Sequence, residues 1–459
     1  MIDAVLEDLR ECLGERVSTA PAVLDEHGRD EGWHAPAAPD AVVFPSTTAD
    51  VAAVVRACAR RGVPVIPFGA GTSLEGNVTP VHGGVTIDLS QMDRILEVNV
   101  EDLDCRVEAG VTRNALNRVL AREGLFFPID PGADATLGGM AATRASGTNA
   151  VRYGTMKDNV LGLTAVLADG SIVRTGTRAR KSSAGYDLTR LLVGSEGTLG
   201  VITEVGLRIY GVPEVIGAAV CSFGSLGGAV RTVIEAIQLG IAVARLELLD
   251  DVQVEACNRF SDLALPATPL LLVEFHGSQV TVADQASAFE AIATSHGGSG
   301  WEWTTDAAQR DRLWAARHQA YYAAKALRPG SLAIPTDVCV PISRLAECIV
   351  ETRADVDRSG VVAPIVGHVG DGNFHVLVLF DPSVAAEVEA AHALNARLVA
   401  RAQAMGGTCT GEHGVGCGKL EFMAGEHDRA ALGMMAAIKH ALDPDGILNP
   451  GKVIPPLDA

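Results

Sequence analysis

The sequence predicts an α+β protein, in which a first half of alternating strands and helices precedes an antiparallel sheet covered by helices. Short apolar runs and capped helical segments alternate as far as about residue 211. Longer apolar strands follow at 270–275 and 375–380. Segments with helical periodicity and composition surround these strands, at 306–327, 384–405 and 426–442.

The elements of the first half follow from caps and turn residues. Ser46-Thr-Thr-Ala-Asp50 opens a helix, because Ser and Thr are good N-caps and an acid suits the first turn. Gly62 is the expected C-terminal cap of this helix. The other expected elements are strands at 63–68, 84–89 and 105–110, a helix at 114–123, a hairpin at 161–173 that turns at Asp169-Gly170, and two strands joined by a Gly-rich turn in 191–210.

The composition disfavours several classes of protein. The 459 residues carry a net charge of −19, which argues against nucleic acid or anionic membrane as a partner. No apolar run reaches the ~18 residues of a membrane helix. The acidic amphipathic start lacks the basic region of a signal peptide, so the cytoplasm is the expected compartment. The nine cysteines are odd in number and contain no Cys-x-x-Cys pair, which indicates reduced thiols.

Two histidines flank a glycine-rich turn in Gly367-His-Val-Gly-Asp-Gly-Asn-Phe-His375. Asp-Gly is a strong signal for a two-residue type I′ hairpin, because both central residues need φ > 0. A turn at Asp371-Gly372 would pair His368 directly with His375, with Cβ atoms roughly 5 Å apart. Two imidazoles at that separation can converge on one metal ion.

A Glu-His dipeptide inside Gly411-Glu-His-Gly-Val-Gly416 supplies further ligand chemistry. Glu412 is a candidate third ligand, and three protein ligands would leave an open coordination position, as catalytic metal sites do. His413 would be a titratable group beside it. A single strand histidine is more often packed or exposed than bound to metal, so this prediction depends on the whole set. Spacing alone leaves open whether the two segments meet.

Three glycine-rich clusters lie in the first half, at 69–77, 130–139 and 194–202. The first follows a strand but matches neither the Gly-x-Gly-x-x-Gly dinucleotide fingerprint nor a Walker A loop, so a Rossmann nicotinamide site is disfavoured. Successive backbone N–H groups in such a loop can still hold a pyrophosphate. One such cluster alone is more often a turn, whereas three together indicate that backbone approaches a large, extended ligand.

Taken together, these motifs resemble those of the flavin-dependent D-lactate dehydrogenases, which are similar to the glycolate oxidase large subunit and belong to the vanillyl-alcohol oxidase type of FAD fold. The resemblance covers nearly the whole chain in the family's order. It rests on Pro67-Phe-Gly-Ala-Gly-Thr-Ser-Leu-Glu-Gly76, Pro131-Gly-Ala-Asp-Ala-Thr136, Gly194-Ser-Glu-Gly-Thr-Leu-Gly200, the segments 367–375 and 411–416, and Asn449-Pro-Gly-Lys452.

The resemblance implies four parts of the chain. They are an N-terminal helical segment at 1–35, a two-part PCMH-type FAD-binding domain at 36–213, a substrate cap domain with the metal site at 214–442, and a C-terminal tail at 443–459 that returns to the FAD domain.

The resemblance also implies which residues hold FAD. The first loop would bind the pyrophosphate, the second cluster would lie along the flavin, the third would wrap the adenosine and ribityl side, and the tail would lie near the isoalloxazine. In this order the residues are Pro67, Gly69, Ala70, Gly71, Thr72, Ser73, Gly76 and Asn77; Pro131, Gly132, Thr136, Gly139, Ser146, Gly147 and Gly154; Glu196, Gly200, Val201 and Ile202; and Asn449. Some relatives attach FAD through a His, but the first loop contains none, so non-covalent FAD is expected.

For catalysis, the resemblance implies a divalent metal, Zn or Mn, held by His368, His375 and Glu412, with His413 as the base. A 2-hydroxy acid chelates such a metal through its carboxylate and hydroxyl, which lowers the hydroxyl pKa. The base takes this proton, and a hydride passes to the flavin. Arg317 matches a family Arg that grips the substrate carboxylate, a task that suits a bidentate fork.

Two departures from the family pattern bear on the substrate. Relatives that act on 2-hydroxyglutarate carry an Asn two residues after the second hairpin His, where this chain has Leu377. They also carry a Lys in the strand where this chain has Ile334-Pro-Thr-Asp-Val338. Both residues serve the distal carboxylate in those relatives. Their absence favours D-lactate or a similar D-2-hydroxy acid with a small or apolar tail, and it leaves glycolate open.

The predicted function is therefore FAD-dependent oxidation of a D-2-hydroxy acid to the 2-oxo acid, by a D-lactate dehydrogenase that passes electrons to a cytochrome, a quinone or a partner flavoprotein. Such an acceptor would place the enzyme at the periphery of a membrane. Three other functions stay open: a glycolate oxidase subunit, a flavin-binding electron-transfer subunit, and a metal-dependent hydrolase whose glycine loops are only turns. A homodimer is among the assemblies that the sequence leaves open.

Overall fold

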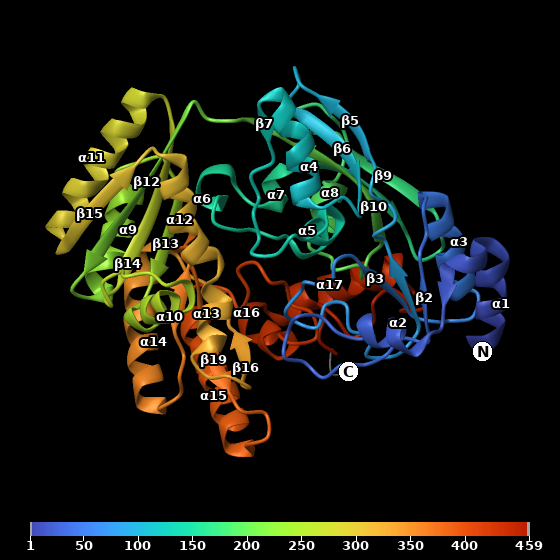
Figure 1. The fold of residues 1–459 in the computed structure, drawn as a ribbon. Coiled ribbons are helices and arrows are strands. Elements are labelled where there is room, and N and C mark those ends of the chain that lie inside the picture. The colour runs from blue at the N-terminus through green and yellow to red at the C-terminus, as the bar shows by residue number, and fades with distance from the viewer. Residues whose placement is uncertain (1, 457–459) are drawn as a thin grey trace. The chain divides into compact units, whose positions relative to one another are not determined.

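The computed structural model describes residues 2–456, without the side chains of Ala315, Ala316 and His318. The chain divides into two compact units, each with its own sheets and helices (Figure 1). Of the described residues, the first unit comprises 2–146, 154–212 and 412–456, and the second comprises 147–153 and 213–411.

Two sheets organise the first unit. The smaller is four-stranded in the order β1-β2-β4-β3, and β2, β4 and β3 run parallel. The larger is five-stranded and antiparallel, in the order β5-β6-β10-β8-β9, and β7 and β11 form a separate ribbon. The strands are β1 Val17–Ser18, β2 Ala41–Val43, β3 Val65–Phe68, β4 Val85–Asp88, β5 Ile95–Asn99, β6 Asp104–Glu108, β7 Leu125–Phe126, β8 Val160–Val166, β9 Ile172–Gly176, β10 Val201–Arg208 and β11 Tyr210–Gly211.

Threonine caps begin three helices of the first unit, and the first of these caps lies in the predicted segment 46–50. Thr47 caps α3 by accepting a hydrogen bond from the backbone N–H of Asp50, and Thr112 and Thr136 cap α4 and α5 in the same way. The helices are α1 Ile2–Leu13, α2 Pro21–Glu26, α3 Thr48–Ala59, α4 Arg113–Leu120, α5 Leu137–Thr143, α7 Met156–Asn159, α8 Leu188–Leu192, α16 Met423–Glu426 and α17 Arg429–Leu442.

One predicted strand is wrong. The sequence Leu191-Leu-Val193 is apolar enough to suggest a strand before the third glycine cluster, but residues 188–192 form helix α8. The Asp187 side chain accepts a hydrogen bond from the backbone N–H of Arg190, so a local cap overrides the apolar pattern. The strand after this cluster forms as expected.

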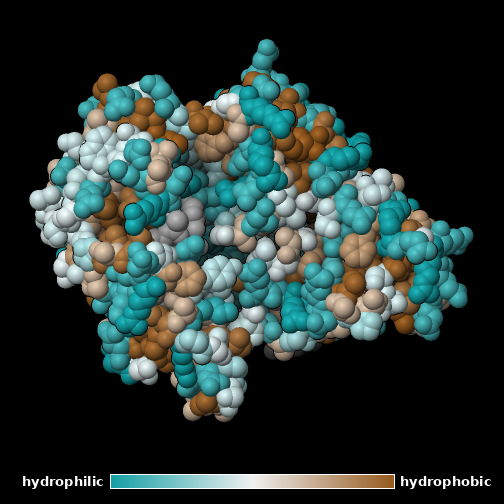
Figure 2. Space-filling model, viewed as in Figure 1, coloured by the Kyte–Doolittle hydropathy of each residue, from teal (hydrophilic) through white to brown (hydrophobic). Residues whose placement is uncertain are grey.

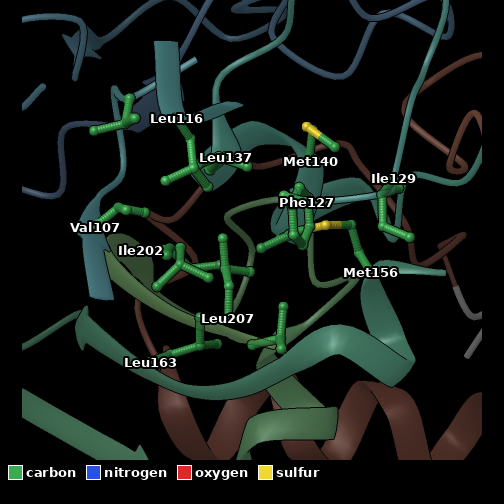
Figure 3. Packing of buried hydrophobic residues seen from close by; sticks show 14 of the residues in the cluster. Val107, Leu116, Phe127, Ile129, Leu137, Met140, Met156, Leu163, Ile202 and Leu207 are labelled. Atoms are coloured by element: carbon green, nitrogen blue, oxygen red, sulfur yellow. The ribbon is translucent and has the colours of Figure 1, made fainter. Parts of the chain in front are cut away.

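A hydrophobic core lies between the five-stranded sheet and helices α4 and α5 (Figure 3). Val107 of β6 and Leu207 of β10 meet Leu116 of α4 and Met140 of α5, and all four side chains are at most 1% exposed. This packing fixes the start of α5. It thereby fixes the N-cap Thr136, which is one of the predicted FAD residues.

The second unit contains the predicted antiparallel sheet. This sheet is eight-stranded in the order β15-β12-β14-β13-β18-β19-β16, and β17 also pairs with β19. The strands are β12 Val215–Phe223, β13 Val243–Leu249, β14 Leu270–Gly277, β15 Gly298–Thr304, β16 Leu332–Pro335, β17 Val338–Cys339, β18 Ile365–Gly367 and β19 Asn373–Phe380. The helices are α6 Ala150–Tyr153, α9 Leu226–Gln238, α10 Asp251–Ser261, α11 Gln279–Ser295, α12 Ala307–His318, α13 Ala320–Ala326, α14 Leu345–Ser359 and α15 Ala385–Ala404.

One helical prediction needs adjustment, because the expected helix at 306–327 is two helices, α12 and α13, separated at Gln319. The sequence predicts residues 412–442 with the cap domain, a boundary that stays a prediction, and by compactness they lie in the first unit. The reason is that Ile438 and Leu442 of α17 pack against the core around β6 and β10.

The surface and the thiols agree with the composition. Figure 2 shows hydrophilic side chains over much of the visible face, interrupted by smaller apolar areas. Within residues 2–456, none of the helices is both long and apolar enough to span a bilayer. No disulfide joins any of the nine cysteines, all of which lie in this described range.

Candidate functional site

The turn between the two hairpin histidines differs from the predicted one. The strands pair Val366 with His375 and Ile365 with Val376, so His375 does not lie directly opposite His368. Residues 369–371 form a 3-10 turn, and only Gly372 takes a positive φ, of 81°. The type I′ prediction is therefore wrong, because Asp371 keeps the right-handed conformation of the 3-10 turn rather than the left-handed one that type I′ requires.

The two imidazoles nevertheless lie together. Val366 and His368 are two residues apart and point to one face of the sheet, and Val366 is the cross-strand partner of His375. The histidines are thus diagonal neighbours, with ring centroids 5.4 Å apart and ring planes at 83°. Both are buried, at 8% and 7% exposed. The prediction that the hairpin brings them together holds with a different register.

Each imidazole is held through Nδ1 by a group that can only accept a hydrogen bond. His375 Nδ1 lies 2.9 Å from the carbonyl oxygen of Thr336, and His368 Nδ1 lies 2.7 Å from Oε1 of Glu247. A carbonyl or carboxylate oxygen needs a donor, so both rings carry their proton on Nδ1. The lone pair of each neutral ring is then on Nε2, the atom that a metal would take.

Glu247 connects the hairpin to Arg317. Its side chain is 0% exposed, and its Oε2 accepts a 2.6 Å hydrogen bond from Nε–H of Arg317. Burial alone would raise the pKa of Glu247, but Arg317 and His368 outweigh it and hold the pKa below its usual value. Because Nε binds Glu247, a carboxylate ligand would have to be met by the two terminal NH₂ groups of Arg317.

These residues share one face of the sheet. The ladder pairs Leu249 with Val366, so its continuation by two residues puts Glu247 opposite His368. Leu377 follows His375 by two residues and therefore points to the same face, where it is 3% exposed. It belongs to a hydrophobic cluster that also contains Trp314. The surroundings of the histidine pair are thus apolar on the Leu377 side.

The segment that leads to Glu412 is anchored beneath the hairpin. The Thr410 hydroxyl donates to Asp337 over 2.9 Å, and the same carboxylate accepts a 2.8 Å hydrogen bond from the Asn373 side chain. A Cβ on Gly411 would lie 2.1 Å from Nδ2 of Asn373, so only glycine fits there. Glu412 follows Gly411 by one peptide bond, with Cα atoms about 3.8 Å apart.

His413 belongs to a buried cluster of charged groups in the first unit. Its Nδ1 lies 3.5 Å from Oε1 of Glu75, and Nζ of Lys419 lies 3.1 Å from the same oxygen. Nε2 of His34 lies 3.7 Å from Oε2 of Glu75. Although burial raises the pKa of Glu75, Lys419, His34 and His413 outweigh it and lower this pKa to about 2. Glu75 is therefore an ionised partner for His413.

Replacing Glu75 with Gln is expected to destabilise the protein at pH 7 by about 3 kcal/mol, because a lowering from 4.5 to about 2 is worth 1.36 kcal/mol per pKa unit. The folded-state pKa is depressed, so the stabilisation is present above pH 4.5 and is lost as the pH falls towards 2. Urea unfolding of wild type and variant across this window measures it. The exposed Glu97→Gln control should change stability by less than about 0.5 kcal/mol. Equal stability of wild type and Glu75→Gln at pH 7 would refute this charge assignment.

The first two glycine clusters meet at Thr136. A Cβ on Gly69 would lie 2.3 Å from Oγ1 of Thr136, so a side chain is excluded where the first loop passes the start of α5. Gly71 and Gly76 have φ of +67°, which a residue with a side chain adopts only with strain. The Ser73 hydroxyl and the Gly76 N–H both donate to the Asp30 carboxylate, which fixes the position of the first loop.

One hydrogen-bond network joins the first glycine loop, the third glycine cluster and the C-terminal tail. Nδ2 of Asn449 donates to the carbonyl oxygens of Asn77 and Glu196, over 2.9 and 2.7 Å. The Glu196 carboxylate accepts from Nδ2 of Asn77 and from the N–H groups of Val415 and Gly416. Glu196, predicted beside the adenosine, is thus engaged in holding three segments together. Oδ1 of Asn449 is buried and has no hydrogen-bond partner among the described residues.

The remaining predicted FAD residues fall into three groups. Val201 and Ile202 are 0% and 4% exposed in the hydrophobic cores, so contact with FAD would use their backbone. Gly147 and Gly154 have positive φ, of 146° and 75°. The third group of predicted FAD residues lies in loops or near the ends of helices and strands. Its members are Pro67, Ala70, Thr72, Pro131, Gly132, Gly139, Ser146 and Gly200.

The chain fits both groups that the resemblance implies. For FAD, Oδ1 of Asn449 is a buried acceptor that lacks a described hydrogen-bond donor. For a divalent metal, the two Nδ1-protonated imidazoles supply two nitrogen ligands of the kind that Zn and Mn accept.

Sequence reasoning missed Glu247, Glu75 and Thr336. Thr336 acts through its backbone carbonyl, for which no sequence signal exists. Glu75 lies inside the first loop and was treated as a spacer between glycines. Glu247 was detectable, because Arg245 and Glu247 alternate with Leu246 and Leu248 in a strand that is otherwise apolar. Charged residues at inward positions of a buried strand are rare and need partners.

Comparison with known families assigns the class of protein. A family described as FAD linked oxidases, C-terminal domain, matches residues 212–453, and one described as FAD binding domain matches residues 39–176. The fold agrees: the crystal structure of p-cresol methylhydroxylase with substrate bound superposes with a TM-score of 0.81 at 19% identity, covering 98% of this chain and 96% of that one. At this identity the likeness concerns the fold alone.

Two curated relatives narrow the class. The chain is 52% identical to a probable mitochondrial D-lactate dehydrogenase of Danio rerio, over 99% of this chain and 92% of that protein. It is 46% identical to the mitochondrial D-lactate dehydrogenase [cytochrome] of Arabidopsis thaliana, over 91% of this chain and 74% of that protein. The chain therefore belongs to the FAD-linked oxidase family that includes the D-lactate dehydrogenases and the glycolate oxidase subunit GlcD.

Proposed function

We propose that this protein oxidises D-lactate to pyruvate with non-covalent FAD and a divalent metal. The observation that carries this proposal is the pair of buried imidazoles on one sheet face of an FAD-linked oxidase, each held as the Nδ1–H form, with Arg317 joined to His368 through Glu247. When bound, the metal polarises the substrate hydroxyl and carboxylate, and the flavin accepts the two electrons of the oxidation as a hydride equivalent.

The metal ligands are proposed as Nε2 of His368, Nε2 of His375 and the carboxylate of Glu412. Chain connectivity supports Glu412, because Gly411 packs against Asn373 of the hairpin. Zn or Mn suits two imidazoles and one carboxylate.

The substrate groups have separate partners. Arg317 binds the carboxylate through its terminal NH₂ groups, since Glu247 occupies its Nε–H. His413 accepts the hydroxyl proton on Nε2, and Glu75 faces its Nδ1. FAD is held by the glycine loops at 69–77, the segment around Thr136 and Asn449.

Steady-state oxidation with an artificial electron acceptor tests the substrate. D-lactate should give the highest kcat/KM, and L-lactate should give little or no turnover. Glycolate lacks the methyl group, so its kcat/KM should be lower by about 10-fold or more. A higher kcat/KM for glycolate than for D-lactate would assign the protein to the glycolate oxidases instead, and a purified protein without flavin absorption would favour the hydrolase.

The apolar side of the histidine pair gives a prediction about the acid's tail. Leu377→Asn is expected to raise the ratio of kcat/KM for D-2-hydroxyglutarate to that for D-lactate by about 10-fold, the value of one added hydrogen bond. It should also cost about 2–4 kcal/mol of stability, because Leu377 is 3% exposed and its replacement buries an amide.

Leu379→Asn is the matched control, since Leu379 is 1% exposed and lies two residues further on the same face. It should destabilise similarly without changing the substrate ratio. If both variants change the ratio equally, Leu377 does not contact the tail of the substrate.

The electron acceptor is inferred to be a cytochrome or a quinone, with the enzyme in the cytoplasm at the membrane periphery. The Arabidopsis relative's name specifies a cytochrome, and this chain has no Rossmann fingerprint for a nicotinamide. Reduction of cytochrome c in the presence of D-lactate checks this inference. Reduction of a quinone alone would identify the other acceptor, and reduction of neither would point to a partner flavoprotein. A homodimer stays a prediction.

A further inference from the structure

Glu247 binds two of the proposed site residues at once. Its Oε1 lies 2.7 Å from Nδ1 of His368, and its Oε2 lies 2.6 Å from Nε of Arg317. All three residues belong to the second unit, and they come from strand β13, the end of strand β18 and helix α12. One carboxylate therefore fixes a proposed metal ligand with one oxygen and the proposed substrate arginine with the other.

A carboxylate at position 247 is not needed to fill the core around strand β13. Glu247 is 0% exposed between Leu246 and Leu248, in a strand that otherwise supplies apolar side chains to the core. A buried charge is costly, and well-packed apolar residues are often as stable as a buried ion pair. What sets the Glu247 carboxylate apart is that both of its partners, His368 and Arg317, are proposed site residues.

A second buried pair nearby provides the contrast. Asp250 follows β13 directly, is 0% exposed and lies 3.1 Å from Arg353. Its Oδ1 also accepts a hydrogen bond from the Gln253 N–H, which caps helix α10. This pair contacts none of the proposed site residues through a described hydrogen bond, so it represents an ion pair with a structural role.

We propose that Glu247 is a positioning residue that orients the side chains of the proposed metal ligand His368 and the proposed substrate-binding Arg317 relative to each other. By accepting from Nδ1–H of His368, it aims the Nε2 lone pair of that ring at the metal. By accepting from Nε–H of Arg317, it turns the terminal NH₂ groups toward the substrate carboxylate. The inference rests on the proposed function for the identity of the ligands, and it adds that one group orients both.

Glu247→Gln tests this role, because the amide has one accepting oxygen and one donating nitrogen for two donors. Either His368 or Arg317 then faces a donor and turns away. Zn²⁺ affinity, measured by competition with a chromophoric chelator, is expected to fall by about 10–100-fold while FAD stays bound. The KM for D-lactate is expected to rise, and excess Zn²⁺ should restore part of kcat without restoring KM.

Asp250→Asn is the matched control and should leave Zn²⁺ affinity and KM unchanged. If Glu247→Gln does not fold, Glu247→Asp serves instead. It keeps the charge, but it is one methylene too short to reach both partners, so Zn²⁺ affinity should still fall. Wild-type Zn²⁺ affinity and KM in the Glu247 variant would overturn the proposal, and so would a wild-type protein that binds neither Zn²⁺ nor Mn²⁺.

The metal titration also separates the two proposals. A wild-type protein that does not oxidise D-lactate, but whose Zn²⁺ affinity depends on Glu247, would refute the proposed substrate and support the positioning role. A protein that oxidises D-lactate with unchanged Zn²⁺ affinity in Glu247→Gln would refute the positioning role alone.

Discussion

Replacing His368 with Ala is expected to abolish stoichiometric metal binding while FAD remains bound. In the proposed metal site this ring is one of two buried nitrogen ligands, and Glu247 holds its Nδ1 so that Nε2 is the atom left for a metal. Loss of a whole ligand should lower metal affinity by more than the ~10–100-fold typical of outer-shell changes. A catalytic metal at this site would contribute several kcal/mol of transition-state stabilisation, so its loss should lower kcat/KM for D-lactate by about 10³-fold.

Metal analysis and flavin absorption of the purified variant, measured side by side, check this result. His296→Ala is the matched control, since His296 is a part-buried histidine of the second unit that contacts Glu235 and none of the proposed ligands. It should keep full metal content. Unchanged metal in His368→Ala would show that the hairpin is not the metal site.

Replacing Arg317 has the second largest expected effect. Arg317→Lys keeps a positive charge but loses both the fork and the Nε–H bond to Glu247, so kcat/KM for D-lactate should fall by about 10–100-fold, mainly through KM. Arg317→Met removes the charge and should lower kcat/KM by about 10³-fold. It also leaves Glu247 with His368 as its remaining described partner, at a cost of about 3–5 kcal/mol of stability.

Steady-state kinetics and thermal unfolding separate the two effects. Arg353→Lys alters another part-buried arginine that is paired with a buried carboxylate, and it should reduce stability without changing KM. If the KM of Arg317→Lys equals that of the wild type, Arg317 does not bind the substrate carboxylate and is only the counter-ion of Glu247.

The sequence was informative where local chemistry decides the structure. A cap predicted the start of α3, the helix expected at 114–123 forms as α4 and the turn after it, and apolar runs predicted β14 and β19. It failed where local rules compete. Asp371-Gly372 has the composition of a type I′ turn, yet the chain makes a 3-10 turn and shifts the register by two residues.

That error was tolerable for a physical reason. Side chains alternate with a period of two, so a shift of two residues leaves both histidines on the same face of the sheet. A shift of one would have separated them. The prediction that His368 and His375 lie together therefore survived a wrong prediction of how they pair.

Long-range partners were beyond the sequence. Glu247 lies 121 residues before His368, and only the order of strands β13, β18 and β19 brings them together. The hydrogen-bond network of Asn77, Glu196 and Asn449 similarly joins segments up to 372 residues apart. Family resemblance indicated which segments matter, but the partners within them follow from the fold.

Anaerobic reduction of the enzyme-bound flavin by D-lactate tests the central claim most directly. We expect the protein, purified with FAD and loaded with Zn²⁺ or Mn²⁺, to lose its visible flavin absorption within one turnover when D-lactate is added. The metal-free protein and the protein mixed with L-lactate should keep this absorption. Retained flavin absorption with D-lactate and metal, or equally fast bleaching of the metal-free protein, would contradict the account.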